Sequence, residues 1–425
     1  MGHSEKYWGF IKDPLYGYIR ITKSEKLIID TLPFQRLRRI KQLAGAQYVY
    51  PAANHTRFEH SLGTMHLAGE IATNLLEASD KIDINKVRMA ALLHDVGHGP
   101  LSHLFEPILS KFIDKNHEDM SIQIIRESEI HDTLKKSEFD PKEISSLAVG
   151  RLSDKKRPFL DQIIRSSVDA DKMDFLLRDS YHTGAGYGTI DMFRLIYTMD
   201  LLDKNLAVDA TAISTLETFL LARLESFRTI YFHRTTRAAQ IMVIRALENA
   251  MSELNLFGSD LLTKYLQLDD CTLWQMLKNS KSKDIINDLD KRKLIKCAYD
   301  KTFFVKDQLV TNIFNNESVR KRIEGEIAEK AKVPHEEVTI DVPSLPSVPY
   351  HYAIDIEPMS IPIFHKMKTG EKIPQKLEEL SRIVGSLMVF LNIIRIYTKE
   401  EFREKVRKAS EDVLGDAPLS NTVSS

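Results

Sequence analysis

The pattern of apolar and polar positions predicts a chain built mainly of helices. Apolar residues recur at helical spacing from Thr56 to Ala78, which is typical of a helix with one buried face. Phe34 to Leu43 and Ile163 to Asp179 are read as two further helices. Ala210 to Asn255 contains neither glycine nor proline and keeps the helical period, so it is one very long helix or two in line.

Shorter patterns predict the strands and the end of the chain. Apolar residues alternate on either side of a Pro-Leu-Tyr-Gly turn between Tyr7 and Thr22, which predicts a hairpin. Prolines set among valine, isoleucine and tyrosine predict a strand-and-loop module from Val338 to Phe364. Leu377 to Lys408 is read as a final pair of helices, and 411–425 as a tail that buries little.

Together these elements predict a mainly α fold with a small C-terminal α+β appendage. The length of 425 residues suits one large domain or two ordinary ones. We expect a catalytic region over residues 1–255, a helical and α+β region over 256–410, and the tail over 411–425.

Charge and cysteine content narrow the class of protein. Lys plus Arg is 59 and Asp plus Glu is 60, so the balance weighs against a dedicated nucleic-acid binder, and any basic site must be local. Cys271 and Cys297 are too few for a disulfide framework or a cysteine-type zinc site. No signal peptide or apolar run of membrane-spanning length is visible, so we expect a cytoplasmic protein without a membrane partner.

Candidate chemistry is concentrated between Ala91 and Phe105. An apolar helical run delivers His94 and Asp95 side by side, and two glycines and a proline then end the helix. The freed backbone can bring His98 and His103 back toward the same place. Imidazole beside carboxylate is a mixed nitrogen and oxygen ligand set, which suits zinc, iron, manganese or nickel better than calcium or magnesium.

Three more polar clusters lie in apolar helical surroundings: 54–61, His117-Glu118 and 169–174. A single His-Asp pair is more often structural than metal-binding, but four such clusters favour a metal centre. Within the third cluster, Asp169 and Asp174 are read as helix-surface salt bridges. The basic residues of the helix predicted at 34–43 suit either a solvated face or a binding site.

The order of His60, His94-Asp95 and Asp171 resembles the HD-domain metal-dependent phosphohydrolases. Four longer motifs are similar to the branch that contains the SAM-and-HD-domain dNTP triphosphohydrolases and microbial dGTPase-like relatives: Asp13–Gly17, Phe34–Leu43, Arg57–Gly63 and His94–Pro100. The similarity is dense from about Ile11 to Gly188 and thinner to about Ala250. We expect no SAM domain, because the motifs begin within the first residues of the sequence.

The resemblance implies an HD-domain helical core and assigns roles to its polar residues. The implied metal ligands are His60, His94, Asp95 and Asp171. His117 matches a general acid, and Glu106 matches the acid that orients it, where the relatives have Asp. His98 is implied to hold water or phosphate, and magnesium is implied to bridge the substrate phosphates.

Further matches concern the substrate. Arg57, Lys172 and His103 are implied to contact phosphates. Gln42 and Leu43 match positions beside the deoxyribose, Asp179 matches a residue that binds the sugar 3′-hydroxyl, Phe175 stands where the relatives have a tyrosine, and His233 matches a histidine near the base.

A regulatory site is implied as well. Asp30, Gln35 and Arg38 match positions that read a guanine nucleotide, so GTP or dGTP is the expected activator and a homotetramer or dimer the expected assembly. Gly9 stands where the relatives have a phosphate-binding lysine, which keeps constitutive activity as an alternative.

The sequence therefore predicts hydrolysis of a deoxynucleoside triphosphate to deoxynucleoside and triphosphate. One alternative is a nucleotidase or phosphodiesterase of the same superfamily that acts on another nucleotide. Another is a nucleotide-sensing regulator with a vestigial site, against which the complete set of metal-binding positions argues.

Overall fold

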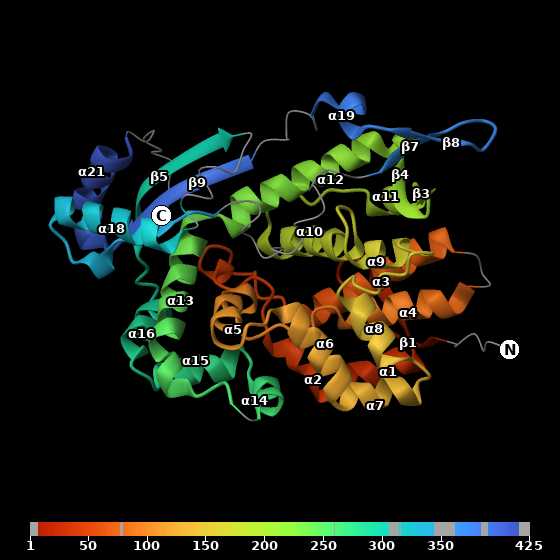
Figure 1. Ribbon diagram of the computed structural model, residues 1–425, viewed down its shortest axis with the longest axis horizontal. Helices are drawn as coiled ribbons and strands as arrows, with labels where there is room; N and C mark the ends of the chain where they lie inside the picture. Colours follow the sequence, from red (N-terminus) through yellow and green to blue (C-terminus); the bar gives the residue numbers. More distant parts are fainter. Residues whose placement is uncertain are drawn as a thin grey trace. The chain divides into compact units, whose positions relative to one another are not determined.

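The computed structural model of the protein describes residues 7–76, 80–258, 260–305, 314, 316–343, 362–383 and 390–415. The chain divides into two compact units that interleave along the sequence. Unit 1 comprises Met1–Ser226, Met251–Met276 and Ile356–Gly385, and unit 2 comprises Phe227–Ala250, Leu277–Asp355 and Ser386–Ser425. The division into a catalytic region over 1–255 and a helical and α+β region over 256–410 stays a prediction. Helices dominate the described residues, so the prediction of a mainly α fold with small sheets is confirmed (Figure 1).

The chain begins with the predicted hairpin. Strand β1 (Tyr7–Asp13) pairs antiparallel with β2 (Gly17–Thr22). Gly17 opens β2 with a φ of +73°, a left-handed conformation that glycine adopts at little cost. Thr22 then caps α1 (Lys23–Ile29) in a capping box, which fixes the angle at which the hairpin joins the helical core.

The prediction of a single helix over 34–43 is wrong. Helix α2 (Leu32–Gln35) passes into a 3₁₀ turn, η1 (Arg36–Arg39), and the backbone is extended at Ile40. Tertiary hydrogen bonds outweigh helical propensity here, because Arg36 is buried and donates to the carbonyl of Leu268 while the Lys41 amide donates to Asp270. The basic residues therefore do not form one solvated face, and the chain beyond Ile40 is a loop.

The core of unit 1 is formed by α3 (Arg57–Leu75), α4 (Lys81–Leu93) and α10 (Ala170–Thr183) (Figure 1). Helix α3 packs against both of the others, and fully buried side chains such as Met65 and Leu92 fill the contact. A capping box at Thr56 starts α3 one residue after the predicted start.

The single helix predicted over 163–179 is two helices. Helix α9 (Phe159–Ile164) ends at Arg165, whose backbone is extended, and α10 begins after Asp169. Asp169 accepts a hydrogen bond from the Lys172 amide at 2.8 Å and so acts as an N-cap. The apolar period continues across both helices, which is why the break is not visible in the pattern.

A four-stranded sheet completes unit 1. Its order is β3-β4-β7-β8, with β3 (Met199–Leu202) antiparallel to β4 (Asn205–Asp209). Strand β4 is parallel to β7 (Ile363–Lys366), which is antiparallel to β8 (Lys372–Gln375).

Shorter helices and 3₁₀ turns connect these elements along the chain. They are η2 Ala46–Tyr48, η4 Ser102–Leu104, α5 Glu106–Ile113, α6 His117–Glu127, α7 Glu129–Lys136, α8 Pro141–Ala148, α11 Met192–Tyr197, η5 Ala210–Ala212, α14 Leu261–Gln267, α15 Asp270–Lys278, α16 Lys283–Asp290, η7 His335–Glu337, α19 Leu377–Leu380 and η8 Glu400–Phe402.

Unit 2 contains a three-stranded sheet, in which β9 (Phe390–Thr398) lies between β5 (Lys296–Val305) and β6 (Thr339–Asp341). Helices α18 (Glu317–Ala331) and α21 (Arg403–Leu414) pack against each other. A cluster of buried side chains from these strands and helices includes Ile340, Ile396, Ile327 and Val406.

The helix pair predicted over 377–408 is therefore wrong, because a central strand occupies its middle. The segment is rich in β-branched residues such as Ile393 and Ile394, which favour a strand where a neighbouring strand is present. The final helix also extends to Leu414, into the segment predicted as a tail, and 416–425 lie outside the described residues.

Two other predicted segments have mixed outcomes. The stretch 210–255 forms two helices, α12 (Ile213–Ser226) and α13 (Arg234–Leu254), separated by a π-helical turn at Phe227–Tyr231. The module predicted over 338–364 supplies β6 and β7 to different sheets, and its residues 344–361 lie outside the described part.

None of the described helices combines the length and the apolar character needed to cross a membrane.

Candidate metal centre and catalytic site

The four residues predicted as metal ligands lie together where three helices meet. His60 is in the first turn of α3, His94 ends α4 and is followed by Asp95, and Asp171 is in the first turn of α10. Each position follows from a local signal, since the capping residue Thr56 starts α3 and Asp169 starts α10.

The distances between the ligand atoms suit a single ion. His60 Nε2 lies 3.1 Å from Asp171 Oδ1 and 3.7 Å from Asp95 Oδ2. His94 Nε2 lies 3.3 Å from Asp95 Oδ1 and 3.8 Å from Asp171 Oδ1. Two atoms that each lie about 2.1 Å from one cation are at most about 4.2 Å apart, so all four distances are compatible with a shared ion.

Hydrogen bonds orient both imidazoles. His60 Nδ1 donates to Asp174 Oδ2 at 2.8 Å, and His94 Nδ1 donates to the carbonyl of Ala91 at 2.7 Å. The opposite nitrogens, Nε2 of both rings, are buried and make no hydrogen bond with any described residue. An imidazole held through Nδ1–H with a bare Nε2 is the usual state of a metal-ligating histidine, so these residues fit a divalent metal.

The charges of the centre also suit a cation. Burial alone would lower the pKa of His60, but Asp171, Asp174 and Asp95 raise that pKa to about 10, so without a metal ion these carboxylates attract a proton to the Nε2 that a bound cation would displace. Burial would raise the pKa of Asp95, yet the Arg57 guanidinium holds it well below its usual range. The carboxylates therefore remain ionised, and a positive charge at their centre is stabilised.

The guanidinium of Arg57, predicted to contact phosphate, is engaged by the protein in this structure. Its Nη1 is ion-paired with the carboxylate of Asp95, a candidate metal ligand, and Nε donates to Ser102 Oγ at 2.7 Å. Its Nη2 lies 3.2 Å from His103 Nε2. Arg57 is buried, so it joins the metal ligands to the neighbouring histidine cluster.

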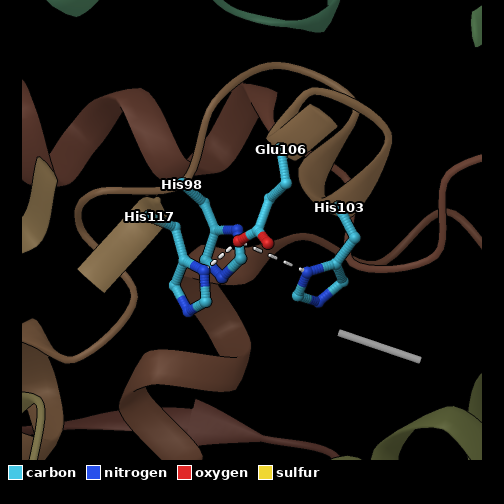
Figure 2. A group of neighbouring side chains, drawn as sticks. All are labelled: His98, His103, Glu106 and His117. Carbon is cyan, nitrogen blue, oxygen red and sulfur yellow. Dashed lines mark hydrogen bonds and ion pairs between the residues drawn. The ribbon is translucent and has the colours of Figure 1, made fainter. Parts of the chain in front are cut away.

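That second cluster consists of His98, His103, Glu106 and His117 (Figure 2). His98 follows α4, His103 lies in η4, and Glu106 and His117 are the first residues of α5 and α6. The ring of His98 stacks on that of His117 with centroids 4.0 Å apart, and Glu106 Oε1 is ion-paired with His117 Nδ1. The predicted catalytic residues are thus neighbours in space.

Asp95 connects the two groups. Its Oδ1 lies 3.2 Å from His98 Nε2, on the far side of the carboxyl group from Arg57. Gly97 makes the approach possible, because a Cβ at this position would overlap the backbone at His117 and Ser121 in α6.

Protonation differs within the cluster. Burial, together with the positive charge of Arg57, holds the pKa of His98 well below its usual range, and burial does the same for His103. Burial also opposes protonation of His117, but the carboxylate of Glu106 outweighs it and raises the pKa. One protonated imidazole therefore stands beside two neutral ones, which is an arrangement suited to general acid chemistry.

The predicted substrate-binding residues of unit 1 are mostly buried. Leu43 and Phe175 are buried, and the backbone N–H of Gln42 donates to the carbonyl of His55 at 3.0 Å. Asp179 Oδ1 lies 2.7 Å from His55 Nε2, and Lys172 Nζ lies 2.7 Å from Asp169 Oδ2. His233 belongs to unit 2, where its Nδ1 accepts a hydrogen bond from the Thr235 amide at 3.2 Å.

The residues predicted to read a guanine nucleotide lie close to one another along the chain. Asp30 caps the C-terminus of α1 and is ion-paired with Lys26. Gln35 Nε2 donates to the carbonyl of Ile29 at 2.7 Å, and its Oε1 accepts from Arg38 Nε at 2.9 Å. Asp30 and Arg38 are exposed, so both are accessible to a ligand.

Sequence reasoning missed one residue of the centre and misplaced another. Asp174 is fully buried, where it accepts from His60 and pairs with Arg178, and Asp169 is fully buried as the cap of α10. The prediction that both form surface salt bridges is wrong. A signal was present for Asp174, since it lies three residues after Asp171 on the same helix and follows apolar Met173.

Comparison with known proteins places this site in a family. The model of the HD domain matches residues 57–178, which include all four candidate metal ligands, and the model of the HD associated region matches residues 190–421.

Two curated relatives share about a third of their aligned residues with this chain. An uncharacterized protein of Methanocaldococcus jannaschii is 35% identical over 313 residues, covering 72% of this chain and 63% of that protein. A deoxynucleoside triphosphate triphosphohydrolase SAMHD1 homolog of Dictyostelium discoideum is 33% identical over 315 residues, covering 69% of this chain and 60% of that protein. The chain thus spans less than two thirds of the length of either relative.

Solved structures share the fold over almost the whole chain. A hypothetical protein from Aquifex aeolicus has a TM-score of 0.77 at 30% identity, covering 94% of this chain and 99% of that one. A phosphohydrolase from Bacteroides thetaiotaomicron has a TM-score of 0.69 at 26% identity, covering 92% and 99%. The chain therefore belongs to the HD-domain family, and an HD-associated region follows the domain in this chain.

Proposed function

We propose that the protein hydrolyses deoxynucleoside triphosphates to deoxynucleoside and inorganic triphosphate in a metal-dependent reaction. The observation that carries the proposal is the position of the His117–Glu106 pair, which is linked through His98 to the metal-ligand carboxylate of Asp95. A relative from Dictyostelium discoideum bears the name deoxynucleoside triphosphate triphosphohydrolase, which supports this substrate class.

The metal centre would be formed by His60, His94, Asp95 and Asp171. A transition metal held by these residues (zinc, iron, manganese or nickel) would supply Lewis acidity, and magnesium with the substrate would supply further positive charge. Arg57 and Lys172 would add protein cations to the same task. Arg57 would keep Asp95 ionised in the resting enzyme and turn donors toward phosphate when substrate binds.

Proton transfer would depend on the histidine cluster. His117 is kept protonated by Glu106 and would donate its proton to the departing 5′-oxygen of the deoxynucleoside. His98 and His103 have lowered pKa values because they are buried, so they would act as neutral hydrogen-bonding groups that hold water or phosphate. His117 would thus act as the proton donor, while His98 and His103 would contact the phosphates or water without transferring the proton.

Selection of a deoxynucleotide would depend on Gln42, Leu43, Phe175 and Asp179 at the sugar. The family resemblance also assigns a role near the base to His233, which belongs to unit 2. Asp179 is buried and paired with His55, which supports a fixed acceptor for a sugar hydroxyl. We further propose that GTP or dGTP binds at Asp30, Gln35 and Arg38 and favours a closed homo-oligomer, a tetramer or a dimer.

The experiment is to incubate the purified protein with each dNTP, NTP and dNMP in the presence of manganese or iron, with and without GTP, and to separate the products by chromatography. Release of deoxynucleoside from dNTPs supports the proposal. Products only from monophosphates would instead show a nucleotidase, and no product from any nucleotide would favour a nucleotide-binding regulator.

A further inference from the structure

The turn of the N-terminal hairpin is hydrogen-bonded to the carboxylate that orients a metal ligand. Tyr16 Oη donates to Asp174 Oδ1 at 2.8 Å, and Asp174 Oδ2 accepts from His60 Nδ1 at 2.8 Å. The Asp174 carboxylate thus connects Tyr16 in the hairpin turn to the imidazole of His60, a candidate metal ligand.

Arg178 holds the same carboxylate and the same turn. Its Nε and Nη2 donate to the two oxygens of Asp174 at 2.8 and 2.9 Å, and its Nη1 donates to Asp13 Oδ2 at 3.0 Å. Asp13 Oδ1 in turn accepts from the amides of Leu15 and Tyr16 at 2.8 and 3.2 Å. The hairpin turn and the support of the metal ligand are therefore two ends of one network.

The network is buried and close-packed. Asp174 and Arg178 have no exposed side-chain surface, and the side chain of Asp13 is 5% exposed. Gly63 on α3 leaves the space they occupy, since a Cβ there would overlap Asp174 Oδ1. The Tyr16 ring also lies 5.1 Å from the ring of His66, also on α3. A shift of the turn cannot be absorbed by loose packing, so it must reach the carboxylate.

We propose that Tyr16 is a positioning residue for the metal centre, because through Asp174 it sets the orientation of His60 and couples the N-terminal hairpin to metal affinity. The inference rests on the metal centre of the proposed function. It assigns a purpose to the Asp13–Gly17 motif, which the catalytic scheme leaves without one. By linkage, metal binding must stabilise the hairpin as much as the hairpin strengthens metal binding.

The test compares Tyr16→Phe with wild type in cobalt binding, followed by the visible absorbance of Co²⁺ against a competing chelator. Loss of one hydrogen bond, two steps from the metal, should weaken binding about threefold to tenfold. Asp174→Asn, which removes the charge next to His60, should weaken it about tenfold to hundredfold. Tyr18→Phe is the matched control, since Tyr18 lies on the same hairpin, is exposed, and should leave cobalt affinity unchanged.

Hydrogen exchange gives a readout independent of activity. Cobalt should slow amide exchange across Tyr7–Thr22 in wild type and less so in Tyr16→Phe. If Tyr16→Phe does not fold, Asp13→Asn weakens the same network from the turn and replaces it in both measurements. Equal cobalt affinity and equal protection of the hairpin in wild type and variant would overturn the inference. A wild type that binds no cobalt would overturn the metal centre of the proposed function, and this inference with it.

Discussion

His98 and His117 stack with their ring planes 16° apart, yet they favour opposite protonation states. Burial and Arg57 lower the pKa of His98, whereas the Glu106 carboxylate raises the pKa of His117 in spite of burial. Two stacked imidazolium ions would repel each other, so a neutral ring beside a charged one is the stable arrangement. The proton of the cluster is thereby assigned to His117, and Glu106 is what keeps it there.

This assignment predicts a pH effect for Glu106→Gln. The active form has protonated His117, so activity falls as the pH rises through its pKa. Removing the carboxylate leaves burial to lower that pKa, and the alkaline limb of the profile of kcat/KM against pH should move down by about one unit or more. The measurement is kcat/KM on a dNTP from pH 6 to 10. Glu127→Gln, an exposed change at the other end of α6, should leave the limb in place. An unmoved limb in Glu106→Gln would contradict the role of Glu106.

Asp95→Ala and His94→Ala should lose the bound transition metal and turnover together. Each substitution removes one of the four candidate ligands, whose nitrogen and oxygen atoms lie close enough to bind a single ion. Asp95→Ala also leaves Arg57 without its buried partner. Metal content is measured by elemental analysis and folding by circular dichroism. Asp80→Ala, at an exposed position before α4, serves as the control. Full activity in metal-depleted Asp95→Ala would exclude the proposed centre.

Asp179→Asn should impair the use of deoxynucleotides without removing the metal. Asparagine keeps the volume of the buried side chain but weakens a charged hydrogen bond, a loss of about tenfold to hundredfold in kcat/KM. Kinetics on dNTPs and the metal content of the same preparation are compared. Unchanged kinetics would show that the sugar binds elsewhere.

Regulation is tested at Arg38. Arg38 is an exposed residue whose Nε donates to Gln35 Oε1, and Arg38→Ala should lower or abolish any rise in rate caused by GTP or dGTP. Activity on a second dNTP and mass by light scattering are followed across a titration of each guanine nucleotide. If neither quantity responds in wild type, the guanine-nucleotide site is absent and these residues are structural.

The candidate metal ligands could be predicted from the sequence because they lie next to recognisable helix starts and ends. His94 and Asp95 end an apolar helix before Gly97, and His60 follows a helix start at Thr56. The resemblance to a known family then joined marks that are far apart in the chain. For Asp174 the sequence offers only its spacing of three residues from Asp171, whereas a carboxylate on a helix is usually exposed. Its burial depends on contacts with Tyr16, His60 and Arg178, which come from other parts of the fold or the next turn of α10.

The elements that sequence misjudged are those decided by distant partners. The stretch after Gln35 has helical composition, but two hydrogen bonds keep it from continuing as a helix: the buried guanidinium of Arg36 donates to the Leu268 carbonyl, and the Lys41 backbone amide donates to the Asp270 carboxylate. Strand β9 has apolar residues that would also suit a helix, and its nine-residue pairing with β5 decides the outcome. Local propensity cannot contain this information, since both partners lie far away in sequence.

The most direct measurement is incubation of the wild-type protein with dGTP and manganese. The paramagnetic manganese is then removed with a chelator, and the products are identified by ³¹P NMR of the phosphate and chromatography of the nucleoside. The proposed reaction predicts inorganic triphosphate and deoxyguanosine in equal amounts, and no turnover after the metal is removed with a chelator. Formation of dGMP with pyrophosphate, or equal turnover in the metal-free protein, would contradict it.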